Sequence, residues 1–337
     1  MPAVSSREIR LAARPKGWPS LDDFAMAAVE VPAPPDGWVQ VRNLCMSVDP
    51  YMRGRMDEGK SYVPPFELGE PLEGAAVGEI VESRAAGLAA GDIVTSMFGW
   101  REYFAAPADT VRKVDPSVRP LSAYLGVLGV TGFTAWVGLQ LFEIATGERV
   151  FISAAAGAVG SVAGQLAKLR GCFVVGSVGS PRKVAFALEE LGYDAAFNYK
   201  DGDIRRQLAR AAPDGIDVYF DNVGGEHLEA ALSALRVNGR IIACGAISAY
   251  NASEPPPGPR NLGLVIGKRL SIKGFIVTDW SRRMPEFVAE TGRYLREGKL
   301  KAEETVVDGI ENAPRAFLDL LNGENIGKMV VKLSGVS

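Results

Sequence analysis

Glycines in a short loop after an apolar run are the first feature of this sequence that could do chemistry. The run at 150–154 is followed closely by Gly157 and Gly160. A strand, a glycine loop and a helix form the usual binding site for a dinucleotide: one glycine lets the backbone approach the pyrophosphate, and another lets the helix pack closely on the strand. Ala155 replaces the first glycine of the usual fingerprint, so the match is partial. The spacing predicts a dinucleotide site at this loop.

Polar residues about 20 positions further on indicate which dinucleotide is bound. An enzyme that uses NAD places Asp or Glu there for the ribose 2′-hydroxyl, whereas this chain has Ser180, Arg182 and Lys183. Ser180 is expected to cap a helix with Pro181 in its first turn, so both cations would oppose the helix dipole. Arg182 and Lys183 could be solvated surface residues, but a bound phosphate would offset their unfavourable interaction with the helix dipole. We therefore expect NADP(H).

The expected secondary structure differs between the two halves of the chain. Residues 37–115 hold short strand patterns separated by glycines, which predict a compact β-barrel. From about residue 149, strand patterns alternate with helical ones at the spacing of βαβ units, and this predicts a doubly wound parallel sheet. The predicted strands of that sheet are 150–154, 173–178, 195–199, 216–220, 240–244 and 271–277. A length of 337 residues agrees with two domains.

Two helices after the glycine loop have apolar residues at helical spacing. In each, one stripe is expected to pack on the sheet and a glycine to end the helix. The stripes and their glycines are Val162, Leu166, Leu169 and Gly171 in the first helix, and Val184, Leu188, Leu191 and Gly192 in the second.

Composition and charge exclude several classes of protein. A net charge of −3 gives no reason to expect nucleic acid or an anionic membrane as a partner. Three scattered cysteines and one histidine are too few for a disulfide framework or a zinc site. His227 is expected on the surface at a helix start, and Cys45 and Cys244 as small buried residues. The N-terminus has no long apolar segment, so a cytoplasmic enzyme is expected.

The segment 120–142 carries no charge and is long enough to span a bilayer. It contains four glycines, however, and lacks flanking clusters of cations. We interpret it as a buried helix and turn at a domain junction.

Five segments in register resemble one known family when taken together: 153–161 (SAAAGAVGS), 220–225 (FDNVGG), 244–251 (CGAISAYN), 274–277 (GFIV) and 322–328 (NGENIGK). They are similar to those of the zinc-independent medium-chain dehydrogenase/reductases, in the branch of prostaglandin reductases and alkenal/alkenone double-bond reductases. The stretch 48–53 (VDPYMR) fits the N-terminal signature of that branch. The resemblance covers essentially the whole chain.

The resemblance implies a fold and a set of functional residues. The fold would be a Rossmann NADP-binding domain at 126–299 and a GroES-like β-barrel domain at 1–125, joined by 300–337, and the chain would form a homodimer. The implied cofactor-binding residues are Gly157, Ala158, Val159, Gly160, Ser161, Ser180, Lys183, Tyr199, Asn222, Cys244, Gly245, Ala246, Ile247, Ser248, Phe275, Ile276, Val277 and Asn325.

The implied reaction is the NADPH-dependent reduction of the C=C bond of an enone or alkenal, without a metal. Hydride would reach the β-carbon, and Tyr250 with the ribose hydroxyl would stabilise the enolate oxygen. Tyr250 could instead pack beside the proline-rich loop 255–259, and Tyr51 could line the substrate site or anchor the turn after Pro50. The alternative functions are an NADPH quinone oxidoreductase and, as a less favoured reading, a non-catalytic NADPH-binding protein.

Overall fold

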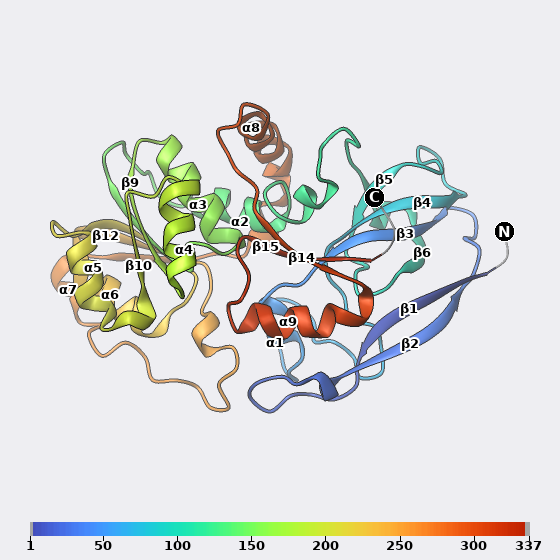
Figure 1. The fold of residues 1–337 in the computed structure, drawn as a ribbon, viewed down its shortest axis with the longest axis horizontal. Helices are drawn as coiled ribbons and strands as arrows, with labels where there is room; N and C mark the ends of the chain where they lie inside the picture. The colour runs from blue at the N-terminus through green and yellow to red at the C-terminus, as the bar shows by residue number, and fades with distance from the viewer. Residues whose placement is uncertain (1–2, 334–337) are drawn as a thin grey trace. The chain divides into compact units, whose positions relative to one another are not determined.

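The computed structural model describes residues 3–333, which fall into two compact units. The first unit runs to Leu125 and resumes at Glu304, and the second is Gly126–Glu303. Figure 1 shows the elements of both units along the chain. The segment 120–142 contributes a 3-10 turn (Leu121–Leu125) to the first unit and α2 (Val130–Gly138) to the second.

The second unit is built on a six-stranded sheet in which every neighbouring pair is parallel. Its strand order is β10-β9-β8-β11-β12-β13, so the order reverses between β8 and β11. Ligands of such sheets bind at the carboxyl ends of the strands beside that reversal. The strands are β8 (Arg149–Ser153), β9 (Phe173–Val178), β10 (Ala195–Asn198), β11 (Ile216–Asp221), β12 (Leu235–Ala243) and β13 (Ser271–Gly274).

Helices cover both faces of this sheet because alternate strand residues are apolar on each side. Phe151, Val175 and Tyr219 lie in one core cluster with residues of α5, α6 and α7. On the other face, a Cβ added to Gly138 of α2 would lie 2.5 Å from the ring of Phe220. The helices of this unit, after α2, are α3 (Ala158–Leu169), α4 (Pro181–Ala185), α5 (Ile204–Ala211), α6 (Gly225–Ala234), α7 (Leu264–Lys268) and α8 (Met284–Arg296).

The two predicted apolar stripes are confirmed only in part. Val162, Leu166 and Leu191 are buried, but Leu169 is 39% exposed because α3 ends there and the chain turns away at Gly171. Leu188 is 38% exposed and Ala187 is buried instead. A π-helical turn at 186–190 shifts the later side chains around the axis, and the N–H of Leu191 donates to the carbonyl of Phe186.

The first unit is built on a seven-stranded, mostly antiparallel sheet, with order β14-β15-β3-β4-β5-β7 and β6 paired to β3. The pair β1–β2 forms a separate antiparallel sheet that the sequence patterns did not predict. The elements of this unit are β1 (Val4–Leu11), β2 (Phe24–Val31), β3 (Trp38–Ser47), α1 (Tyr51–Arg55), β4 (Ala76–Ser83), β5 (Ile93–Ser96), β6 (Tyr103–Pro107), β7 (Arg112–Lys113), β14 (Glu304–Asp308), α9 (Ala313–Leu321) and β15 (Lys328–Lys332).

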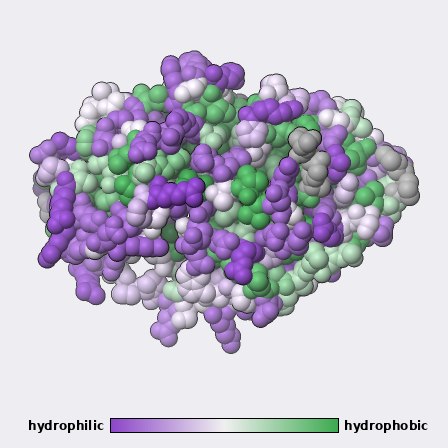
Figure 2. Space-filling model, in the orientation of Figure 1, coloured by the Kyte–Doolittle hydropathy of each residue, from purple (hydrophilic) through white to green (hydrophobic). Residues whose placement is uncertain are grey.

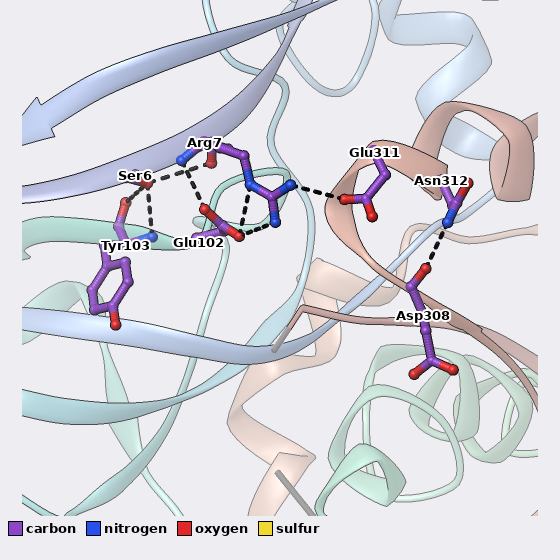
Figure 3. Close-up of polar contacts among 7 residues, drawn as sticks. All are labelled: Ser6, Arg7, Glu102, Tyr103, Asp308, Glu311 and Asn312. Carbon is purple, nitrogen blue, oxygen red and sulfur yellow. Dashed lines mark hydrogen bonds and ion pairs between the residues drawn. The ribbon is translucent and has the colours of Figure 1, made fainter. Parts of the chain in front are cut away.

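The C-terminal segment is integrated into the first unit by pairing and by ion pairs. Strand β15 pairs with β3, and α9 packs into the same core as β1 and α1. Figure 3 shows Arg7 of β1 between Glu102 and Glu311, with N–O distances of 2.6 and 3.1 Å. These pairs are partly exposed, so the apolar core contributes more to stability than they do.

Hydrophilic residues cover most of the face shown in Figure 2, and hydrophobic residues form small groups among them. Within residues 3–333, no helix combines the length and the apolar character that crossing a membrane requires.

Candidate active site

The glycine loop between β8 and α3 has the geometry that a pyrophosphate requires. A Cβ on Gly160 would lie 2.3 Å from the carbonyl oxygen of Ala154, so only glycine lets α3 approach the loop this closely. Ala154 itself has a φ of +51°, a left-handed conformation that is uncommon for a residue other than glycine. Gly157 precedes α3, and the N–H groups of Ala158, Val159 and Gly160 have no acceptor within the helix, whereas that of Ser161 donates to the carbonyl oxygen of Gly157 at 2.9 Å. This loop fits a diphosphate group.

A tyrosine that the sequence analysis did not identify, Tyr193, holds this loop by a hydrogen bond. The hydroxyl of Tyr193 donates to the carbonyl oxygen of Gly160 at 2.8 Å. Its ring packs where Gly164 and Gly176 lack side chains, since a Cβ at either position would lie 2.2 or 2.9 Å from ring atoms. The detectable signal was the presence of two glycines inside a helix and a strand, where glycine normally weakens the element.

Three of the predicted cofactor residues gather at the carboxyl ends of β9 and β10. The hydroxyl of Ser180 accepts the N–H of Lys183 at 3.3 Å and caps α4, as predicted. The ring of Tyr199 lies over Gly179, where an added Cβ would be 3.2 Å from the ring. The segment 177–183 carries no carboxylate. Hydroxyls and a lysine in this position fit a ribose 2′-phosphate rather than a free 2′-hydroxyl.

His227 lies at the start of α6 as expected, but its predicted exposure was wrong. The side chain is 4% exposed, and its ring meets Tyr199 edge-on at a centroid distance of 5.1 Å. Its Nε2 has no hydrogen-bond partner among the described residues. Burial lowers the pKa of His227 to about 4, so the imidazole is neutral near pH 7. The packing of Tyr199 over the helix start covers this histidine.

The predicted cofactor segment 244–248 follows β12 at the same edge of the sheet. Cys244 and Gly245 donate their N–H groups to the carbonyl oxygen of Asp221, each at 2.9 Å. Asn222 donates its side-chain amide to the carbonyl oxygen of Ser153 at 2.8 Å. Burial raises the pKa of the Cys244 thiol to about 12, with a smaller contribution from Asp221. The thiol is therefore protonated, so it is no nucleophile.

Tyr250 lies just beyond this segment with its hydroxyl turned back over residues 245–246. The N–H of Ala246 donates to the hydroxyl oxygen at 3.4 Å, and a Cβ on Gly245 would lie 3.3 Å from it. Among residues 3–333, no acceptor for the Tyr250 hydroxyl proton is found. Burial raises the pKa of Tyr250, so the hydroxyl keeps its proton near pH 7. The side chain can act as a hydrogen-bond donor.

The remaining predicted residues lie apart from this cluster in the chain. Phe275, Ile276 and Val277 follow the edge strand β13 and are half-buried. Tyr51 and Asn325 belong to the first unit. Tyr51 begins α1 and packs against the core of that unit, and burial followed by the charge of Asp49 raises its pKa.

A buried ion pair links the segments that carry Tyr51 and Asn325. The Nζ of Lys328 lies 2.9 Å from Oδ1 of Asp49 and also donates to the carbonyl oxygen of Val48 at 2.8 Å. The amide of Asn325 donates to the carbonyl oxygen of Gly327 at 2.7 Å, which holds the turn before β15. The two family-like stretches 48–53 and 322–328 therefore meet in one network.

Comparisons with known proteins assign the chain to a family. Residues 7–114 match the family model described as the N-terminal domain of oxidoreductase, and residues 158–292 match the model described as zinc-binding dehydrogenase. The 2-alkenal reductase (NADP(+)-dependent) of Nicotiana tabacum is 42% identical over 98% of both chains. Prostaglandin reductase 1 of Sus scrofa is 40% identical over 94% of this chain and 95% of the relative. The chain belongs to the prostaglandin reductase and alkenal reductase family of zinc-independent medium-chain dehydrogenase/reductases.

Other members of the family agree in sequence and fold. The NADPH-dependent curcumin reductase of Escherichia coli (strain K12) is 41% identical over 96% of both chains. The crystal structure of CurA in complex with NADPH from Vibrio vulnificus has a TM-score of 0.94 at 38% identity, covering 98% of this chain and 100% of that one. The predicted fold, a Rossmann domain with a GroES-like domain, is confirmed.

Two further findings concern the alternatives. A quinone oxidoreductase from Pseudomonas syringae has a TM-score of 0.77 at 22% identity, a likeness that shows the fold alone. Although one matching family model is named for zinc, no group of three or more His, Cys, Asp or Glu side chains that could hold a metal ion occurs within residues 3–333.

Proposed function

We propose that this protein uses NADPH to reduce the C=C bond of α,β-unsaturated ketones and aldehydes. The observation that carries the proposal is the hydroxyl of Tyr250, which accepts the N–H of Ala246 and has no acceptor for its own proton among the described residues. A donor of this kind is what conjugate reduction requires, because negative charge develops on the carbonyl oxygen. The relatives named 2-alkenal reductase, prostaglandin reductase and curcumin reductase support the same reaction class.

The chain's residues can hold the cofactor at three places. The first turn of α3, from Ala158 to Ser161, would bind the pyrophosphate, with Gly157 letting the backbone approach it and Gly160 letting α3 pack against the loop. Ser180, Lys183 and Tyr199 would hold the 2′-phosphate, where a lysine offers a charge-assisted hydrogen bond. Asn222, the segments 244–248 and 275–277, and Asn325 would line the rest of the cofactor.

The cofactor and the protein supply different parts of the proposed reaction. NADPH, when bound, supplies a hydride for the β-carbon of the substrate. Tyr250 is the proposed catalytic residue: its hydroxyl donates to the carbonyl oxygen, and the interaction strengthens as that oxygen becomes negative. The raised pKa of Tyr250 keeps the donor protonated near neutral pH. Tyr51 is the proposed substrate-contacting residue.

The proposal includes a homodimer in the cytoplasm. All four residues of the edge strand β13 are exposed, and Ile272 in it and Ile266 in α7 are 47% and 83% exposed. An exposed edge strand with apolar residues can pair with a second copy through its free N–H and C=O groups. Three free cysteines agree with a reducing compartment. Ile272→Lys should convert a dimer to a monomer in sedimentation velocity, and an unchanged coefficient would contradict this interface.

The test of the catalytic assignment is Tyr250→Phe, which removes one hydroxyl and keeps the ring. We expect kcat on a small enone to fall roughly 100-fold or more, as for the loss of one oxyanion donor. The NADPH Kd should stay close to that of the wild type. Tyr124→Phe, which removes a tyrosine hydroxyl bound to a carbonyl oxygen of the first unit, is the matched control. A kcat for Tyr250→Phe equal to that of the control would overturn the assignment.

A further inference from the structure

The side chain that closes β11 has no role in the reaction described so far. Asp221 is 4% exposed and lies beside the point where the strand order reverses. Its Oδ1 accepts three hydrogen bonds: from the hydroxyl of Tyr219 at 2.7 Å, from the N–H of Val223 at 2.9 Å and from the N–H of Gly224 at 2.7 Å. One carboxylate oxygen therefore determines the course of the chain after β11.

These hydrogen bonds shape the turn 222–224 and join it to the end of β8. Gly224 has a φ of +72° and a ψ of −152°, a conformation that favours glycine. The N–H of Asn222 donates to the hydroxyl of Ser153 at 3.0 Å, and the Tyr219 hydroxyl lies 3.0 Å from the same atom. The turn cannot move without breaking contacts on two strands.

The turn 222–224 is hydrogen-bonded to the segment that leads to Tyr250. The hydroxyl of Ser248 donates to the carbonyl oxygen of Val223 at 2.6 Å. Backbone N–H groups of this segment donate to carbonyl oxygens of 221–223: Cys244 and Gly245 to Asp221 at 2.9 Å each, Ile247 to Asn222 at 3.3 Å and Ser248 to Val223 at 3.2 Å. These contacts end two residues before Tyr250.

We propose that Asp221 is a positioning residue, whose Oδ1 sets the turn 222–224 and, through it, the placement of the 244–250 segment and of Tyr250. The effect on catalysis through Tyr250 rests on the proposed function, whereas the coupling of the turn 222–224 to the segment 244–250 does not. This role requires an acceptor oxygen at residue 221 rather than a negative charge. All three hydrogen bonds are accepted by Oδ1, and an amide oxygen in the same place could accept them too. Burial also disfavours the charge and raises the pKa of Asp221.

Three variants separate this role from a loss of stability. Asp221→Leu removes the acceptor, and Asp221→Asn keeps an amide oxygen at Oδ1. Asp217→Leu is the matched control, because Asp217 lies on the same strand and accepts the N–H of Arg149 at 2.8 Å, at the opposite end of β11. The measurements are amide hydrogen exchange of the protein without cofactor, melting temperature, NADPH Kd and kcat on a small enone.

We expect Asp221→Leu to speed exchange in peptides covering 222–250 and to lower kcat roughly 10- to 100-fold, as misplaced catalytic groups do. Asp221→Asn should stay within about threefold of the wild type in kcat, and Asp217→Leu should show neither effect at a similar loss of melting temperature. If Asp221→Leu does not fold, Tyr219→Phe removes one of the three donors and should give a smaller change in the same direction.

Three results would overturn the proposal: exchange in 222–250 that matches the Asp217→Leu control, a kcat that matches this control, or an Asp221→Asn variant as impaired as Asp221→Leu. A wild-type protein that reduces no enone would refute the proposed function alone, because the exchange measurement would still decide whether Asp221 couples the two segments.

Discussion

Replacing His227 by Phe should make the second unit less sensitive to acid. The phenyl ring keeps the edge-on contact with Tyr199 and removes a buried nitrogen that has no partner in the described part of the chain. Near neutral pH the imidazole is already uncharged, so the substitution should change the free energy of unfolding by about 1 kcal/mol or less.

The pH-dependent change in the free energy of unfolding follows from the pKa values of the imidazole in the folded and unfolded protein. In the unfolded chain the pKa is 6.5, and in the folded protein burial lowers it to about 4. Between these values the unfolded chain binds more protons, so this contribution to stability is complete above pH 6.5 and is lost as the pH falls toward 4. A shift of this size corresponds to about 3 kcal/mol.

The assay is urea unfolding of the wild type and His227→Phe at several pH values between about 7 and 4. All other titrating groups are shared, so the difference between the two proteins isolates the histidine. The variant should gain about 3 kcal/mol relative to the wild type over this range. A difference that stays constant with pH would refute the reasoning, since it would mean that His227 accepts a proton as easily in the folded protein as in the unfolded chain.

Further substitutions test the cofactor site and the first unit. Lys183→Glu should raise the NADPH Kd roughly 10-fold or more and leave the NADH Kd nearly unchanged, and equal losses in a titration would contradict a 2′-phosphate contact. Gly160→Ala puts a Cβ 2.3 Å from the carbonyl oxygen of Ala154, so the loop must shift. NADPH binding should weaken and the melting temperature should fall, and an unaltered Kd would show that the loop tolerates a side chain. Lys328→Met leaves Asp49 buried without its cationic partner and should cost about 3–5 kcal/mol in urea unfolding of the first unit. An effect below about 1 kcal/mol would mean that water replaces the lysine.

Local sequence patterns predicted the glycine loop between β8 and α3 because the requirements of this loop are local. The close approach of α3 to Ala154 demands a glycine at 160, and a helix cap demands a residue such as Ser180, so both can be read from a few neighbours. The alternation of strands and helices likewise predicted the parallel sheet, since each βαβ unit carries its own apolar pattern.

Contacts between distant residues could not be predicted in this way. The burial of His227 in α6 depends on Tyr199, which follows β10, and the role of Tyr193 depends on glycines in α3 and β9. The π-helical turn at 186–190 moved Leu188 out of its stripe, although the sequence spacing was regular. Asp221 lies in a segment that matched the family, but only its three hydrogen bonds indicate what its side chain does.

The most direct test of the proposed function is the oxidation of NADPH by the wild-type protein with 2-alkenals, alkenones, quinones and saturated aldehydes, with identification of each product. We predict turnover of the alkenals and alkenones, with the C=C bond reduced and the carbonyl retained. Turnover of quinones alone, or no turnover despite NADPH binding, would contradict the reduction of enones and alkenals.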